Sequence, residues 1–463
     1  MLEVASRIAR GSPLALVAGV SVLLWLAPRL FDAPPTSVRG AVLVVLTIVA
    51  WAVGLFAESV VALLFFMFAA VFEVARPAVI FSGFASPAWW LVLGGAITGM
   101  AIERTGLSQR LAAFLLRRMA ASYRSSLAAV AFASLGLAFV VPSATARVML
   151  LLPMVMALAD RLGLAPGRPG RAGLAMTTVL VSTLHASTIL TANIAGPILL
   201  GAADMIYGIK ISYGSFLILH FPILGVLKTL LLIEIACRFF HEPDWPSPLP
   251  AQATSPMSRP EGVVAAVIVV SLILFVTDAL HGISPAWISL AAAIVCLLPG
   301  IGPLPATSLA RANLGMLLHV AGILGLGAVI ADTGVATALG NELLRLSGVT
   351  PGHPVVNLAI ITAIFSAIAL LTTVIALPVV LVPLAGTFAA ASGLPVLAIL
   401  HLQVVVNSAM LLPYQNFLVV VGMQYARLGA RQGAMFCLLQ AAVTVVILFP
   451  LDYAWWWFLG YLP

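Results

Sequence analysis

Four short polar segments interrupt apolar stretches of the sequence, and they are the places where this chain could do chemistry. They read Pro142-Ser143-Ala144-Thr145, Thr191-Ala192-Asn193, Leu371-Thr372-Thr373 and Pro413-Tyr414-Gln415-Asn416. Hydroxyl and amide groups of this kind can donate to and accept from a small ligand. A helix that restarts presents free N–H groups that favour an anion, whereas unwound carbonyls favour a cation such as sodium. The four segments therefore predict sites for a small anion and a coupling cation.

Two ionisable residues lie near these segments. Arg147 follows Thr145 by two residues, and a guanidinium can hold a carboxylate or a sulfate through two parallel hydrogen bonds. The alternative is that Arg147 pairs with a carbonyl or an acid and holds the local structure. His185 precedes Thr191 and could carry a coupling proton, because histidine has an ordinary pKa of about 6.5. Its alternative is that of a hydrogen-bonded packing histidine.

The composition places these residues in a membrane protein. Of the 463 residues, 62% are hydrophobic and 8% are charged, whereas soluble globular proteins have about 45–50% and about 25%. Long apolar runs recur from Leu14 to Pro463, as a polytopic helical bundle requires. This excludes a soluble enzyme, a nucleic-acid binder and a disordered scaffold. Cys237, Cys296 and Cys437 lie in apolar stretches without paired spacing, so they support neither a disulfide nor a metal site.

The interruptions belong to two kinds of element. Residues 125–160 break near the middle into arms of about 15 residues, which is shorter than the about 20 that a crossing needs. We expect a re-entrant helical hairpin there and a second one at 354–390, each with its tip near the middle of the membrane. Such tips are tolerated where protein or a water-filled cavity satisfies the backbone. Residues 173–200 and 395–424 predict spans that are broken near their centres.

The basic residues indicate the topology. Lys and Arg number 22 and Asp and Glu number 15, which gives a formal net charge of +7. Positive side chains gather on the cytoplasmic side of membrane proteins, and most of these do so if the N-terminus is cytoplasmic. We therefore expect a multi-pass protein of a bacterial inner membrane with a cytoplasmic N-terminus.

A polar linker separates two similar halves. Residues 241–261 contain six prolines and no apolar periodicity. On either side of it, Gly94 and Gly99 recur 228 residues later as Gly322 and Gly327. Because each half has an odd number of spans plus one hairpin, the second copy must cross the membrane in the opposite sense. An inverted repeat with broken helices in corresponding places predicts a secondary transporter with its sites near the midplane.

Three further motifs carry a family resemblance. They are Leu93-Gly94-Gly95 with Glu103-Arg104-Thr105-Gly106-Leu107, Ser143-Ala144-Thr145-Ala146 leading into Leu150-Leu151-Leu152-Pro153, and Ile211-Ser212-Tyr213-Gly214. With them, most of the chain resembles the divalent anion/sodium symporter family, which carries dicarboxylates, tricarboxylates and sulfate. The resemblance implies substrate and sodium sites at the hairpin tips and broken spans. It also implies a homodimer in which one domain moves as an elevator against a dimeric scaffold.

The chain departs from that family at the tips, where the family carries a Ser-Asn-Thr motif. Ala144 stands in place of the asparagine at the first tip, and the second tip has none. Since asparagine oxygens help to build the family's sodium sites, we expect weaker sodium dependence, with a proton or a counter-anion driving transport. Arg147 would also repel a nearby sodium ion while supplying part of its charge.

The residue types and the resemblance together give a candidate site. The expected substrate-binding residues are Ser143, Ala144, Thr145, Arg147, Asn193, Thr372, Thr373, Tyr414, Gln415 and Asn416. Thr191 and His185 are the candidates for ion coupling. Tyr414 and Gln415 could instead only satisfy backbone groups freed by the break. Lys228 and Glu234 share one span six residues apart, and we expect them in the scaffold or at a subunit interface.

The sequence predicts an all-α fold of about 11 transmembrane helices with two re-entrant hairpins and two broken helices. The expected segments are 1–86 (mainly scaffold), 87–213 (first half of the transport domain), 214–311 (scaffold spans and linker), 312–431 (second half of the transport domain) and 432–463 (last scaffold span).

The expected function is secondary transport of a small anion, dicarboxylate-like or sulfate-like, by an elevator mechanism. The alternatives are a proton-coupled or exchange carrier for another substrate class, or a channel. An enzyme is not expected, because the spans contain neither His-Glu spacing nor paired acids. No cofactor is expected beyond a sodium ion or a proton. The expected partners are the anion, the lipid bilayer and a second copy of the chain, with no nucleic acid.

Overall fold

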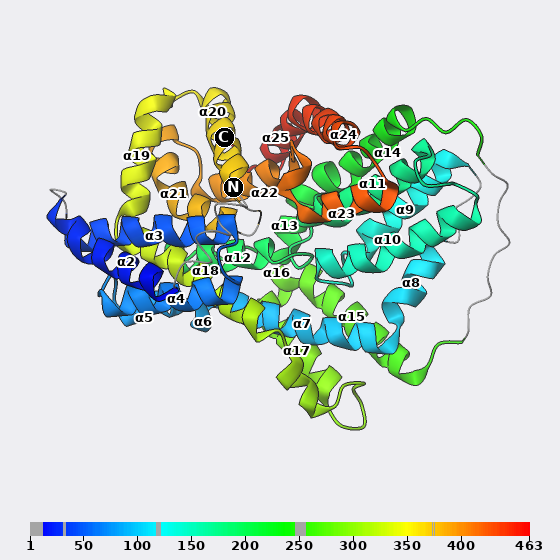
Figure 1. Cartoon of the computed structure of the whole chain (residues 1–463), viewed down its shortest axis with the longest axis horizontal. Coiled ribbons are helices and arrows are strands. Elements are labelled where there is room, and N and C mark those ends of the chain that lie inside the picture. The colour runs from blue at the N-terminus through cyan, green and yellow to red at the C-terminus, as the bar shows by residue number, and fades with distance from the viewer. Residues whose placement is uncertain (1–12, 31–33, 117–121, 246–255, 373, 375) are drawn as a thin grey trace.

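The computed structural model describes residues 13–30, 34–116, 122–245, 256–372, 374 and 376–463. Within these ranges every regular element is a helix, as Figure 1 shows. Residues 246–255 of the expected linker and Thr373 of the expected second tip lie outside them. The all-α expectation is therefore confirmed for the described part of the chain.

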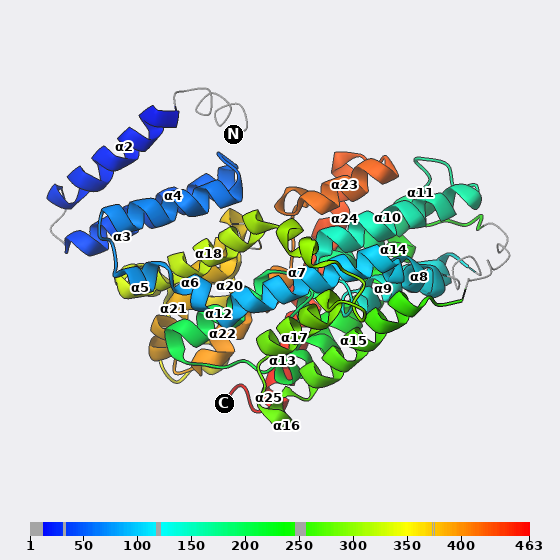
Figure 2. The ribbon, with the colours of Figure 1, turned by 90° about the horizontal axis from the view of Figure 1, so that it is seen from below.

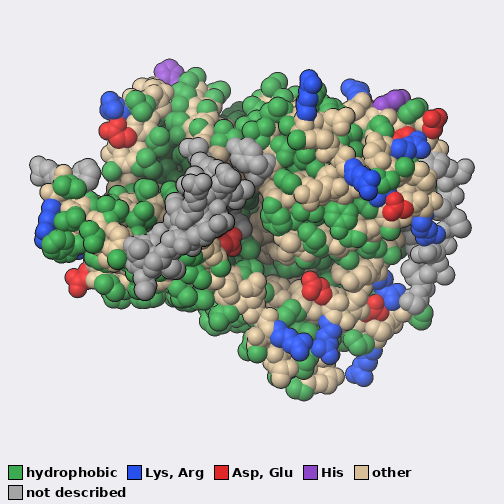
Figure 3. Space-filling view, viewed as in Figure 1, with side chains coloured by type: hydrophobic (Ala, Val, Ile, Leu, Met, Phe, Trp, Pro, Cys, Tyr) green, Lys and Arg blue, Asp and Glu red, His purple; other side chains and the backbone are tan. Residues whose placement is uncertain are grey.

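Five helical stretches in the described ranges are long and apolar enough to cross a membrane. They are α3 (Pro35–Val53), the stretch Tyr213–Phe239 with α13 (Tyr213–His220) and α14 (Lys228–Phe239), α15 (Arg259–Val276), α18 (Leu314–Asp332), and the stretch Ala430–Phe458 with α24 (Ala430–Val443) and α25 (Phe449–Phe458). Eight further apolar helices in these ranges have 10–17 residues and are shorter than this length, so the expected count of about 11 is not confirmed. Hydrophobic side chains also cover much of the surface in Figure 3, as contact with lipid requires.

The first expected hairpin contains α9 (Tyr123–Leu137) and α10 (Ala144–Arg161), which residues 138–143 connect. Helix α10 begins where it does because the Ser143 side chain accepts a hydrogen bond from Ala146 N at 3.2 Å. The helix therefore restarts at the Ser143-Ala144-Thr145 motif, as the sequence predicted.

The first broken span consists of α11 (Pro169–Thr183), the short helix η2 (His185–Thr188) and α12 (Ala195–Tyr207). Asn193 Oδ1 accepts from Gly196 N at 3.2 Å and so satisfies one free N–H at the start of α12. Gly196 is required by close packing, because a Cβ there would lie 2.2 Å from Leu190 O. The break is thus an ordered turn, stabilised by this hydrogen bond and by close backbone packing at Gly196.

The second half of the chain contains the corresponding elements in the same order. They are α20 (Pro354–Leu371), α21 (Leu377–Ser392), α22 (Val396–Ser408), η5 (Pro413–Gln415) and α23 (Phe417–Ala426). In both halves a long helix with a π-helical turn follows the broken span, at Phe221–Leu227 (η3) and Thr444–Leu448 (η6). Helix interruptions at the predicted places therefore occur in both halves of the described chain.

The remaining described helices complete the bundle. They are α2 (Pro13–Leu26), η1 (Ala27–Arg29), α4 (Glu58–Val71), α5 (Pro77–Ile80), α6 (Ser82–Ala85), α7 (Pro87–Thr105), α8 (Leu107–Leu116), α16 (Asp278–His281), α17 (Pro285–Leu297), η4 (Ala306–Arg311) and α19 (Val335–Ser347).

Several sets of helices pack closely together. Helix α7 packs against α17 and α15, and α4 packs against α18, whereas α14 (Lys228–Phe239) packs against α9 and α11. Figure 2 shows α2, α3 and α4 at one end of the molecule and α8 to α11 at the other. Within the range 214–311, α14 packs against α9 and α11, whereas α15 packs against α7 and α17. In the range 432–463, α24 contacts α14 and η5, and α25 contacts η3. Hydrophobicity alone could not show this, because these spans are similarly apolar.

Candidate functional site

A cavity of about 790 Å³ lies where the four interruptions meet. Its lining includes residues 142–146 of the first tip, residues of the first break from 191 to 197, Val374 and Ala376 of the second tip, and residues 415–418 of the second break. This volume is in the range that holds a small-molecule ligand. The structure therefore brings together the four segments that the sequence predicted.

Four helices begin at the wall of this cavity. They are α10, α12, α21 and α23, and Ala144, Ala195, Ala376 and Phe417 at their N-terminal ends line it. Each N-terminus carries unpaired N–H groups and a partial positive charge of about half a unit. Side-chain caps from Ser143, Asn193 and Asn416 satisfy only some of those N–H groups. This wall is consequently suited to an anion without a basic side chain at its surface.

The cavity lining also carries charges of both signs. It includes Glu58 at the start of α4, Glu103 in α7 and Arg311 in η4. His319 Nε2 lies 3.7 Å from the Glu58 carboxylate. The feature of this lining that favours an anion is therefore the set of helix N-termini, not these side chains.

Most of the predicted binding residues line the cavity. Ser143, Ala144, Thr145, Asn193, Gln415 and Asn416 do so, together with Thr191. Gln415 Oε1 accepts from Leu411 N and Leu412 N, each at 2.8 Å, so it satisfies backbone groups freed by the break. The Thr372 hydroxyl donates to Ile368 O at 3.1 Å and stabilises the end of its own helix. Thr373 and the side chain of Tyr414 lie outside the part that the structure describes.

Arg147 is fully buried, and its guanidinium contacts protein backbone. Nη1 donates to Val141 O at 2.5 Å and to Ala192 O at 2.7 Å, and Nη2 donates to Ser182 O at 2.6 Å. These bonds join the first tip to both sides of the first break. The geometry matches the alternative in which Arg147 holds the local structure rather than the substrate.

His185 is also buried, in η2 at the first break. Its Nδ1 lies 2.7 Å from Thr229 Oγ1, and that hydroxyl donates to Gly225 O at 2.6 Å. Because the Thr229 hydroxyl has a single hydrogen, His185 Nδ1 must be the donor in the first bond. His185 therefore matches its packing alternative, in which a hydrogen bond holds the ring.

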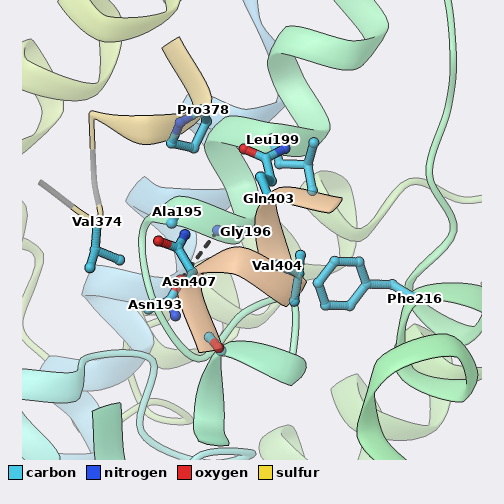
Figure 4. Close-up of a pocket in the computed structure, with 11 residues that line it drawn as sticks. Asn193, Ala195, Gly196, Leu199, Phe216, Val374, Pro378, Gln403, Val404 and Asn407 are labelled. Atoms are coloured by element: carbon cyan, nitrogen blue, oxygen red, sulfur yellow. Dashed lines mark hydrogen bonds between the residues drawn. The ribbon is translucent and has the colours of Figure 1, made fainter. Parts of the chain in front are cut away.

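Sequence reasoning missed a smaller pocket of about 20 Å³, close to the volume of one water molecule. Gln403 and Asn407 of α22 line it together with Asn193 and Val374, and in Figure 4 the Gln403 amide lies beside Leu199. Gln403 is buried, and its Oε1 has no partner among the described residues. The available signal was two amides four residues apart on one face of a mostly apolar helix.

Three comparisons with known proteins bear on the site. A family model described as the sodium:sulfate symporter transmembrane region matches residues 10–462. A protein of Cupriavidus necator described as a membrane protein is 26% identical over 290 residues, which cover 61% of this chain and 56% of that protein. The chain thus matches little more than half of the length of that relative.

The fold is similar to the crystal structure of the YdaH transporter of Alcanivorax borkumensis. The TM-score is 0.54 at 16% sequence identity, and the match covers 82% of this chain and 86% of that one. At this identity the similarity concerns the fold.

Proposed function

Because the chain belongs to the sodium:sulfate symporter family, we propose that it is a secondary transporter of a small divalent anion, dicarboxylate-like or sulfate-like. The resemblance inferred from the motifs is thereby confirmed, and the family implies a membrane setting and sodium as a coupling ion. The substrate and the mechanism for this chain are our proposal. The observation that carries it is the convergence of four helix N-termini on one cavity.

The electrostatics of that wall favour a compact dianion. One helix N-terminus stabilises a negative charge by about 0.3–1 kcal/mol at an exposed site, and by up to about 2 kcal/mol in a partly buried one. Four of them around one cavity favour a ligand that presents several oxygens at once. A sulfate or a dicarboxylate does so, and Ser143 and Thr145 add hydroxyl donors at the same wall.

We propose that the transport step is an elevator movement. The moving body would contain the hairpin and broken helices together with α13, α14, α24 and α25. The fixed body would contain α3, α4, α7, α15, α17, α18 and α19. Support comes from the packing of α14 against α9 and α11, and from the repeated order of elements. An inverted repeat, a homodimer and a cytoplasmic N-terminus belong to the same proposal.

Uptake into proteoliposomes tests the function. The purified chain would be reconstituted and given labelled sulfate, succinate or citrate, each with a sodium gradient, a proton gradient or internal unlabelled anion. We expect saturable uptake of at least one dianion and acceleration by internal substrate, which a channel does not give. Folded protein that moves none of these anions would contradict the proposal, as would flux without counterflow.

A further inference from the structure

We propose that Arg147 and Lys228 are tethered cations that occupy the C-terminal ends of the two broken half-helices, where a coupling sodium ion would otherwise bind. The inference rests on the proposed transport function and deepens it by assigning the source of positive charge at the site. In broken-helix carriers the half-helix C-termini and unwound carbonyls coordinate the coupling cation. In this chain side chains of the protein contact those carbonyls.

The first half-helix is α11, which ends at Thr183. Arg147 Nη2 donates to Ser182 O in its last turn at 2.6 Å, and Nη1 donates to Ala192 O in the break at 2.7 Å. Both oxygens belong to the class of unwound or terminal carbonyls that would bind sodium. A guanidinium therefore takes the place of a cation at the first break.

The second half-helix is α22, which ends at Ser408. Lys228 Nζ donates to Ser408 O, and the lysine is only 2% exposed. Lys228 begins α14 directly after the π-helical turn of η3, and π turns inside helices are frequent at functional sites. An ammonium thus contacts the C-terminal end of the second half-helix, as the guanidinium does at the first.

The two contacts are chemically equivalent although they come from different elements. Each helix C-terminus carries about half a negative charge, which a cation stabilises. In the described ranges neither Arg147 nor Lys228 has a carboxylate within 4.0 Å, so no acid neutralises them. Two buried cationic side chains at these ends offset the partial negative charge that would otherwise attract a sodium ion.

Sodium-dependent thermal unfolding tests the inference without knowledge of the substrate. The purified chain would be melted in sodium chloride and in choline chloride, as wild type and as Lys228→Ala, Lys228→Met and Lys228→Arg. Lys210→Ala, at an exposed lysine, is the matched control. We expect wild type, Lys228→Arg and Lys210→Ala to melt within about 1 °C in the two salts.

Lys228→Ala leaves both space and the free Ser408 carbonyl, so sodium should bind there and raise the apparent melting temperature by about 3 °C or more. Lys228→Met fills the space, so its melting temperature should not respond to sodium. Its apolar side chain also suits a buried position, so this variant can be tested even if Lys228→Ala does not fold. Saturable stabilisation of the wild type by sodium would overturn the inference. So would a folded Lys228→Ala that does not respond, or a Lys228→Met that transports like wild type. Absence of anion uptake would instead contradict the proposed function. The melting experiment would still decide whether Lys228 excludes sodium, because it does not depend on transport.

Discussion

Arg147 shows how far a single residue can be interpreted from its position in the sequence. Its place two residues after Thr145 marked it as important, and the structure buries it completely. The sequence left two partners open, a substrate anion and a backbone carbonyl. The choice depends on where Ser182 and Ala192 lie, and both belong to another element 35 or more residues away. Local spacing carries no information about such a contact.

Replacement of Arg147 should reduce stability before it changes substrate recognition. Arg147→Gln removes donors from three buried carbonyls, and each unsatisfied group costs about 1–3 kcal/mol. We expect an apparent melting temperature lower by several degrees for Arg147→Gln, and a smaller loss for Arg147→Lys, which keeps the charge but not the planar fork. Melting curves without substrate measure this. A variant that melts like wild type but has lost affinity for the anion would show that Arg147 binds substrate.

Ala144 should be a position where added volume blocks the site. It begins α10 and lines the cavity, so a leucine there would occupy space next to the free N–H groups. We expect Ala144→Leu to reduce anion uptake at least about tenfold, with a melting temperature close to wild type. The matched control is Ala113→Leu, at an exposed alanine of α8. Normal uptake by Ala144→Leu would place the substrate elsewhere in the cavity.

Among the elements, the places where helices end and restart were predicted well from the sequence. Prolines and short polar motifs end helices for local reasons, and the four predicted breaks all occur in the structure. The pocket beside Gln403 and Asn407 was missed, because both amides lie inside α22 and interrupt nothing. The role of a polar residue within a continuous helix depends on which residues pack against it, and the sequence does not show these.

The turn in the first broken span should not tolerate a side chain at Gly196. A Cβ at this position would lie 2.2 Å from Leu190 O, which is backbone and cannot move aside cheaply. We expect Gly196→Ala to destabilise the protein by about 2–3 kcal/mol and to abolish uptake. Gly429→Ala is the control, because a Cβ there meets nothing within 4 Å. Equal melting temperatures and equal uptake for the two variants would contradict this account of the break.

For the molecule as a whole, the packing partners of the helices could not be predicted from the sequence. Helices α14 and α15 follow one another along the chain and are both apolar, yet α14 packs on α9 and α15 packs on α7. A linker in the sequence suggested where one structural unit ends, but it lies between halves of the chain rather than between bodies that could move. The shapes of side chains on distant segments decide which helices pack together. Hydrophobic periodicity along the chain does not contain this information.

The proposed elevator movement predicts that a cross-link between the two bodies stops transport, whereas one inside the moving body does not. In a chain whose three native cysteines are replaced by alanine, Gly340→Cys with Thr387→Cys would join α19 to α21, where an added Cβ lies 3.0 Å from the Thr387 Cβ. Gly422→Cys with Val179→Cys would join α23 to α11 inside the moving body, at 3.4 Å. Both separations are close to the about 3.5–4.5 Å that a disulfide needs after slight relaxation.

We expect oxidation to block uptake in the first pair, reduction to restore it, and the second pair to transport in both states. Uptake by the fully oxidised first pair would rule out relative movement of α19 and α21 as the transport step.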